Sequence, residues 1–129
     1  MAVTIKWGNE AKTFTHFAFE GTWSWEEYYE SRRKAMELVQ DIPYTVNIVV
    51  EFTNSNFFPN NLLSNFVSSV EQAPRPFDVC VIVTNSFFLK AITKVISKLQ
   101  SRIKFYLATS VEEAYAIMEK HDITVKKSA

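Results

Sequence analysis

The spacing of hydrophobic positions changes several times along the chain, and these changes mark alternating strands and helices. Segments 3–7 and 15–20 read as short strands separated by a Gly-Asn turn signal, which predicts an antiparallel hairpin. The runs at 46–52 and 79–83 are β-branched and mostly apolar, which is typical of central strands covered on both faces. Segment 104–108 supplies the last predicted strand.

Four segments between and after these strands have helical spacing. Ser24 with Glu27 forms a capping box, and Trp23 with Tyr28 occupies the hydrophobic-staple positions, so a helix should begin here and run to about Gln40. Further helices are predicted at about 60–72, at about 87–100, and after a second capping box at Ser110–Glu113. In the helix at 87–100, the residues expected to face the core are Phe88, Ala91, Ile92, Val95 and Leu99.

The predicted element order is β-β-α-β-α-β-α-β-α, which indicates an α/β fold. Repeated strand–helix–strand units imply right-handed crossovers and a mixed, mainly parallel five-stranded sheet with four helices. The first strand should be antiparallel, at or near an edge. With no linker or repeat, residues 1–129 are interpreted as a single domain whose polar tail, about 122–129, is frayed.

Composition excludes several classes of function. The 14 basic and 14 acidic residues cancel, which disfavours nucleic acid as a partner. The 2 glycines are too few for a phosphate-cradling loop, and neither His16 nor His121 has ligands at metal spacing, so we expect no cofactor and no metal. Cys80 is the only cysteine, and the chain has neither a secretory signal nor an apolar run of about 20 residues. We therefore expect a cytoplasmic protein with no transmembrane segment.

The element order and the closing segment Ala108-Thr109-Ser110-Val111-Glu112-Glu113-Ala114 together resemble the STAS/SpoIIAA-like family, in its divergent SpoIIAA-like branch. The resemblance implies a regulatory protein-interaction module. Anti-sigma-factor antagonists of the family carry a phosphorylatable serine in an Asp-Ser-x-Gly turn after the central strand. Here Asn60 stands at that position and no glycine follows, so the serine switch is missing. Ser55 in the same loop is the one alternative phosphorylation site.

Ligands of open parallel sheets bind beyond the carboxyl ends of the strands. Two such ends carry similar strings, with Phe57 and Phe58 after one strand and Phe87 after another. Phe87 falls about 100° outside the predicted apolar stripe of its helix and should be at least partly exposed. With Asn60 these phenylalanines form a candidate interaction surface for a partner, a second copy or an apolar ligand. The alternative is that the rings roof the core beneath a loop.

Arg32 lies near the centre of the apolar stripe of the first helix. A guanidinium there must reach water or find a carboxylate, because an unpaired buried charge is costly. Glu20, Glu51 and Asp78 are candidate partners for a structural ion pair. The other interpretation makes Arg32 the contact for an anionic ligand.

The remaining polar features give weaker signals. Glu51 ends a central strand, where catalytic carboxylates occur, but it has no identifiable partner residue. Cys80, between valines, should be buried and inert. The lysines at 90, 94 and 98 form a helical ridge that is either a solvated face or a docking site for an acidic partner.

The sequence therefore favours a non-enzymatic STAS-like module that contacts a protein partner, including a second copy of itself as a homodimer. The alternative is a small-molecule or lipid-binding domain that holds an apolar or anionic ligand near Arg32 and the phenylalanine edge. An enzyme that uses Glu51 as its acid or base ranks last.

Overall fold

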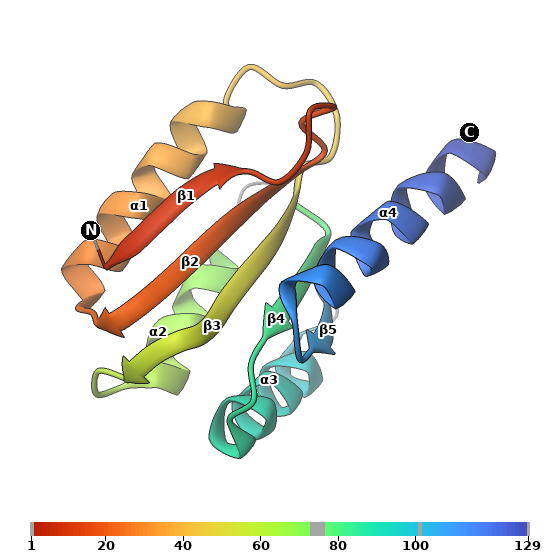
Figure 1. Cartoon of the computed structure of the whole chain (residues 1–129). Helices are drawn as coiled ribbons and strands as arrows, with labels where there is room; N and C mark the ends of the chain where they lie inside the picture. The colour runs from red at the N-terminus through yellow and green to blue at the C-terminus, as the bar shows by residue number, and fades with distance from the viewer. Residues whose placement is uncertain (1, 73–76, 101, 129) are drawn as a thin grey trace.

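The computed structural model describes residues 2–72, 77–100 and 102–128, with side chains as far as Asp122. The predicted order of elements is confirmed (Figure 1). The strands are β1 (Val3–Trp7), β2 (Phe14–Thr22), β3 (Asn47–Phe57), β4 (Val79–Val83) and β5 (Lys104–Ala108). The helices are α1 (Trp25–Val39), α2 (Leu62–Glu71), α3 (Phe87–Leu99) and α4 (Val111–Ser128).

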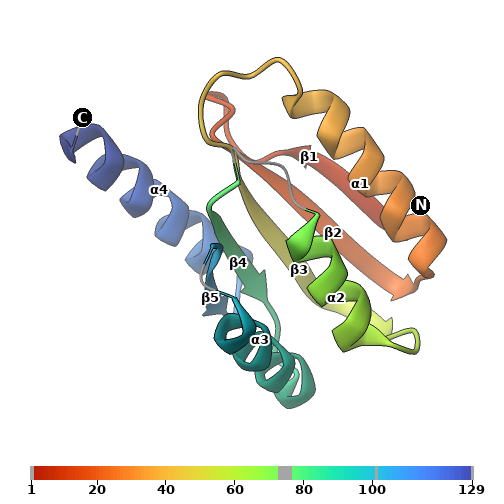
Figure 2. The same cartoon turned by 180° about the vertical axis from the view of Figure 1, so that it is seen from behind.

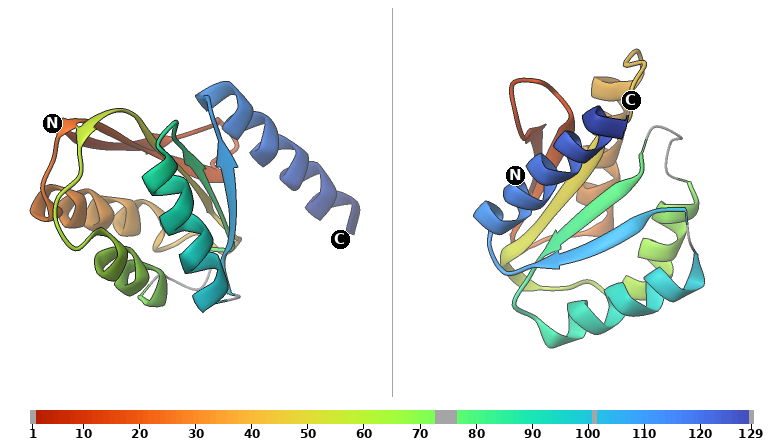
Figure 3. Two further views of the ribbon diagram at one scale, coloured as in Figure 1. Left: turned by 90° about the horizontal axis from the view of Figure 1, so that it is seen from below. Right: turned by 90° about the vertical axis from the view of Figure 1, so that its right-hand side faces the viewer.

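The five strands form one mixed sheet in the order β1-β2-β3-β4-β5. β1 lies at one edge and pairs antiparallel with β2, and all the other pairs are parallel. Because each crossover moves one strand along in the same direction, right-handed connections place α1, α2 and α3 on the same face. α4 follows the last strand and covers the opposite face (Figures 2 and 3).

Helix starts follow the local sequence. The Ser24 side chain accepts a hydrogen bond from the Glu27 amide and the Glu27 carboxylate accepts one from the Ser24 amide, which confirms the predicted capping box at α1. At α4 only half of the predicted box forms. Ser110 Oγ accepts from the Glu113 amide, but the Glu113 carboxylate binds the amide and hydroxyl of Thr109 instead.

Alternation along the strands divides the core into two layers. On the side of α1–α3, Phe17, Phe19, Phe52 and Ile82 pack beneath the helices. On the α4 side the sheet contributes smaller side chains, and Ala114 and Met118 of α4 are fully buried against them. The aromatic excess of the sequence therefore belongs mainly to the α1–α3 layer.

Three further expectations differ from the structure. The inward face of α3 consists of Leu89, Ile92, Thr93 and Ile96, so the predicted stripe was wrong by roughly one position. The reason is that α3 is apolar on two sides, and the inward Thr93 is satisfied locally by the Leu89 carbonyl oxygen, 2.8 Å away. β3 runs on to Phe57, five residues beyond the predicted end. α4 continues to Ser128, so its backbone is helical where fraying was expected.

Candidate functional site

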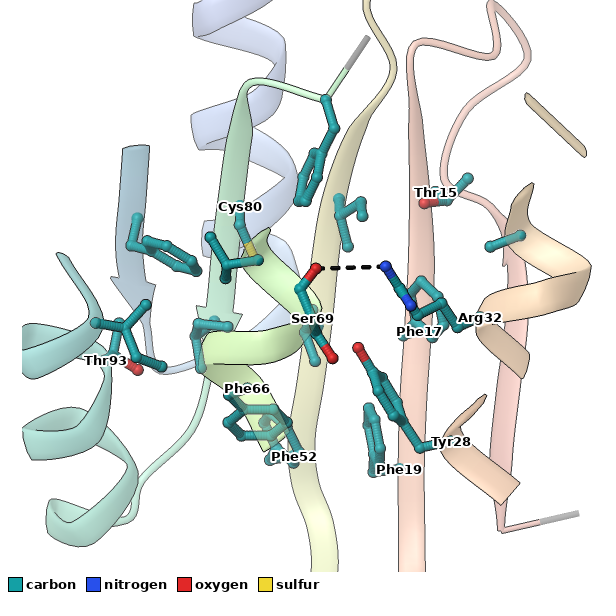
Figure 4. Close-up of a pocket in the computed structure, with 18 of the residues that line it drawn as sticks. Thr15, Phe17, Phe19, Tyr28, Arg32, Phe52, Phe66, Ser69, Cys80 and Thr93 are labelled. Atoms are coloured by element: carbon teal, nitrogen blue, oxygen red, sulfur yellow. Dashed lines mark hydrogen bonds between the residues drawn. The ribbon is translucent and has the colours of Figure 1, made fainter. Parts of the chain in front are cut away.

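An apolar cavity of about 130 Å³ lies between α1, α2, α3 and the sheet (Figure 4). Its walls are formed by the inward faces of the three helices and by the side chains of the strands that point toward those helices. Examples are Phe17, Val50, Ile82, Ala35, Phe66 and Leu89. Protein interiors are normally packed as densely as organic crystals. An apolar space of this size, partly open to the surface, is therefore a candidate ligand site.

Arg32 is the single cation among the described residues that line this cavity. None of the candidate partners Glu20, Glu51 and Asp78 forms an ion pair with Arg32, which is half-buried. Its Nη2 atom instead donates a long hydrogen bond, 3.4 Å, to the carbonyl oxygen of Ser69 (Figure 4). Ser69 lies in the last turn of α2, where helix carbonyls lack partners and no basic residue of α2 is present. Arg32 therefore supplies a positive charge to the C-terminal end of α2.

Two hydroxyl groups accompany Arg32 at this end of the cavity. The Ser69 side chain is 9% exposed, and its Oγ atom has no hydrogen-bond partner of normal geometry among the described residues. It faces the phenol of Tyr28, which also lines the cavity (Figure 4). Burial raises the pKa of Tyr28, so the phenol stays protonated at neutral pH and can act as a donor. One end of an otherwise apolar cavity is thus polar, with donors available.

Cys80 also lines this cavity, from the centre of β4. Complete burial raises the pKa of its thiol far above the ordinary range. The thiol therefore stays protonated and unreactive, as expected from its valine neighbours.

The predicted phenylalanine surface divides into exposed and buried members. Phe87 is 88% exposed at the first position of α3, and Phe57 is 55% exposed at the end of β3. Phe58 instead packs its ring edge against Phe52, with centroids 5.9 Å apart, and roofs the core. Phe88, expected in the core, is 57% exposed because α3 is rotated from the predicted orientation. Phe58 therefore roofs the core, whereas Phe57 and Phe87 are exposed and stay a predicted interaction surface.

The loop that resembles the phosphoserine turn serves as a structural connection. Asn60 is exposed, and its carbonyl oxygen accepts a 2.7 Å hydrogen bond from Trp25 Nε1. Asn61 adopts a left-handed conformation, φ +64°, as it begins α2. Ser55 lies within β3, where Oγ accepts from Trp23 Nε1 and donates to the Phe57 carbonyl. The Ser55 hydroxyl is therefore engaged in holding the entry to α1.

The structure also brings together three residues that the sequence left apart. On the α4 face, His16 Nε2 lies 2.8 Å from Glu51 Oε1, and His16 Nδ1 lies 2.8 Å from the Tyr115 hydroxyl. Thr53 donates to the other Glu51 oxygen at 2.9 Å. Burial lowers the pKa of His16 below its usual 6.5, more than the Glu51 carboxylate raises it. Neutral His16 donates to Glu51 and accepts from Tyr115, so every group in this network is satisfied.

This network explains why Glu51 seemed isolated in the sequence. His16 and Tyr115 are separated from Glu51 by 35 and 64 positions (51 − 16; 115 − 51). The parallel register of β2 with β3 pairs His16 with Val49 and Ala18 with Glu51, so His16 and Glu51 are diagonal neighbours on one face of the sheet. The available signal was strand alternation, since His16 follows Phe14 by two positions and Glu51 follows Val49 by two. Tyr115 could not have been assigned without the packing of α4.

The described residues contain no group of three His, Cys, Asp or Glu side chains arranged to hold a metal ion. No helix in the described part of the chain has both the length and the apolar character that crossing a bilayer requires.

No protein-family model matches the sequence, and no curated protein matches it. The chain is similar in structure to an uncharacterized protein of the DUF3478 family with a SpoIIAA-like fold, from Shewanella loihica PV-4. The alignment has a TM-score of 0.66 at 12% identity, and it covers 88% of this chain and 93% of the other. The strand order, the four helices and this similarity together assign the chain the SpoIIAA-like fold.

Proposed function

We propose that the protein is a non-enzymatic binding module that holds the apolar body of a small molecule between α1, α2, α3 and the sheet. The single observation that carries this proposal is the apolar cavity of about 130 Å³. In another protein, an engineered apolar cavity of about 150 Å³ takes up benzene. The expected ligand therefore has an apolar part about the size of one aromatic ring or a short branched chain.

Energetics favour an occupied cavity. Apolar side chains around an unfilled space lack packing partners on one side and lose dispersion contacts there, which costs free energy. A bound ligand would recover part of this free energy, and its binding would raise the melting temperature.

The non-enzymatic part of the proposal rests on where the titratable groups lie. The His16–Glu51–Tyr115 network is on the sheet face that α4 covers, opposite the cavity. His16 is 4% exposed and both of its ring nitrogens are occupied, so it has no free position for a substrate proton. Cys80, the nucleophile nearest the cavity, stays protonated. These groups support a structural rather than a chemical role.

Calorimetric titration with toluene tests the proposal. Toluene has no polar group, so its binding reports on the cavity alone. Ala35 is buried on α1 and lines the cavity, and Ala35→Leu should fill the space and abolish the binding. Ala91→Leu makes the same substitution on the exposed side of α3 and should leave binding unchanged. The proposal fails if the wild type does not bind toluene, or if both variants bind it equally.

A second candidate function is self-association through the exposed phenylalanines. Phe87 is 88% exposed, and a shallow apolar groove between α2 and α3 is lined by Phe88 and Leu99. Lys90 lies over the Phe87 ring, 5.5 Å from its centroid, and α3 carries no acidic residue. The first turn of α1 is acidic, with Glu26 and Glu27, so a second copy offers a complementary charge. We propose this surface as a homodimer contact.

Light scattering tests this second candidate. The wild type should have the mass of a dimer, and Phe87→Ser should shift it toward a monomer. Lys34→Ser, an exposed change on α1, serves as the control. A wild-type monomer at all concentrations would exclude self-association, and toluene binding would be unaffected by that result.

A further inference from the structure

We infer that the ligand of the cavity is a small monocarboxylic acid, whose carboxylate is held by the Arg32 guanidinium and the Ser69 hydroxyl while its apolar body fills the cavity. This inference rests on the proposed binding function and adds the chemical class of the ligand. It is carried by the polar end of the cavity, where the Arg32 cation lies near the Ser69 hydroxyl, which has no hydrogen bond of normal geometry among the described residues (Figure 4).

The first part of the argument is the state of Arg32. A guanidinium has five N–H donors in a planar fork that matches the two oxygens of a carboxylate. In the described part of the chain Arg32 makes one hydrogen bond, the 3.4 Å contact with the Ser69 carbonyl oxygen, and meets no carboxylate. Its neighbour Arg33 differs, since it is exposed and pairs with Glu30 and Glu37. Arg32 is therefore the cation with donors left for a ligand.

The second part is the Ser69 hydroxyl, which is independent of the first. A buried hydroxyl without a well-formed hydrogen bond is rare in native proteins, because it has lost its bonds to water. Within the described residues Ser69 Oγ has only the Tyr28 phenol beside it and no hydrogen bond of normal geometry, and it sits at the cavity wall that Arg32 also forms. A carboxylate oxygen placed there would accept from Ser69, and the protonated Tyr28 phenol faces the same point (Figure 4).

The donor set also favours a carboxylate over a phosphate group. The guanidinium balances a single negative charge, and the two neutral hydroxyls add hydrogen-bond donors without further charge. A phosphate carries about two charges at neutral pH and three acceptor oxygens, and commonly requires several cations or a row of backbone amides. Among the described residues that line the cavity, Arg32 is alone as a cation and no glycine is present. The cavity volume further restricts the acid to a body about the size of one ring.

The test compares phenylacetate with phenylacetamide, which has nearly the same shape and no charge. Calorimetry on the wild type should show phenylacetate binding about tenfold tighter or more, since hydrogen bonds to charged groups are worth about 1.5–3 kcal/mol. Arg32→Gln should remove this preference. Ser69→Ala should weaken phenylacetate binding several-fold, and Arg33→Gln, the matched control, should not change it.

The outcomes separate the inference from the binding function on which it rests. Toluene binding without any preference for phenylacetate would overturn the carboxylic acid and leave the apolar cavity function standing. Equal phenylacetate affinities for Arg32→Gln and Arg33→Gln would overturn the role of Arg32 in the same way. No binding of toluene, phenylacetate or phenylacetamide would overturn both. The wild-type comparison needs no variant, so the inference is testable even if Arg32→Gln does not fold.

Discussion

Arg32 on α1 donates a hydrogen bond to the carbonyl oxygen of Ser69 on α2, over 3.4 Å. This contact joins two helices that lie on the same face of the sheet and meet at the polar end of the cavity (Figure 4). Because the bond is long, it contributes little, and the guanidinium retains donors for another acceptor. The same residue thus stabilises the end of α2 and offers a charge to a ligand.

The buried His16 makes stability depend on pH. Its pKa is lowered in the folded state, so the native protein binds fewer protons than the unfolded chain. The contribution of neutral His16 to the free energy of unfolding is therefore fully present above about pH 6.5. It is lost as the pH falls through the lowered pKa of the folded state. Urea unfolding from pH 8 to pH 5 should show stability falling below pH 6.5, with a smaller slope in His16→Gln. His121→Gln, a control outside this network, should keep the wild-type slope, and identical slopes in all three proteins would contradict the prediction.

The Tyr115 hydroxyl holds α4 against the sheet through His16. Tyr115→Phe removes the 2.8 Å hydrogen bond and keeps the edge-on ring contact with Phe14, whose centroid lies 5.0 Å away. The expected loss is about 1 kcal/mol in the free energy of unfolding, measured by urea denaturation. Tyr106→Phe on β5, where the ring is 43% exposed, should cost much less. Equal losses in the two variants would show that the hydrogen bond contributes nothing specific.

The two glycines should tolerate alanine unequally, for different reasons. A Cβ at Gly8 would lie 2.0 Å from Phe14 Cε2, so the buried ring must shift, at a cost of about 1–3 kcal/mol. Gly21 has open space around it but a φ of +58°, so alanine there costs about 1–2 kcal/mol through backbone strain alone. Thermal unfolding of Gly8→Ala and Gly21→Ala measures both. Adding Phe14→Leu should restore part of the stability lost in Gly8→Ala and should not restore that lost in Gly21→Ala. No recovery in the Gly8→Ala background would contradict the steric explanation.

The capping box at Ser24 should contribute about 1 kcal/mol. Ser24→Ala removes the side-chain oxygen that accepts from the Glu27 amide, which leaves an unpaired donor at the start of α1. Urea unfolding measures the loss. Ser97→Ala, on the exposed side of α3, removes a serine without a capping role and should be neutral or slightly stabilising. A neutral Ser24→Ala would contradict the prediction.

Features encoded over short stretches could be predicted from the sequence, and features that depend on register or packing could not. The capping box at Ser24 spans four residues, and the valines around Cys80 indicate a buried strand, so the sequence predicted both correctly. α3 has apolar residues on two sides, and periodicity alone could not decide between Phe88 and Leu89 as the inward residue. The orientation follows from the sheet and α2, which the helix sequence does not contain.

The cavity was only partly foreseeable for a related reason. Arg32 stood out as a charge within an apolar stripe, which indicated either an ion pair or an anion site. Ser69 gave no signal, because a single serine is common in an amphipathic helix and the sequence does not show that this one is buried. A void depends on how the side chains of three helices fail to fill the space above the sheet. Sequence patterns indicate which segments have an inward face, but they do not define how well the side chains on that face fill the space.

Crystallography with bromobenzene would test the central claim, that the cavity above the sheet binds a small apolar body, most directly. Crystals exposed to bromobenzene should give an anomalous bromine peak inside the cavity, between Phe66 of α2 and Ile82 of β4, both of which line it. The peak should disappear in Ala35→Leu and persist in Ala91→Leu. An empty cavity in the wild type, or bromine bound only in the surface groove beside Phe88 and Leu99, would contradict the account.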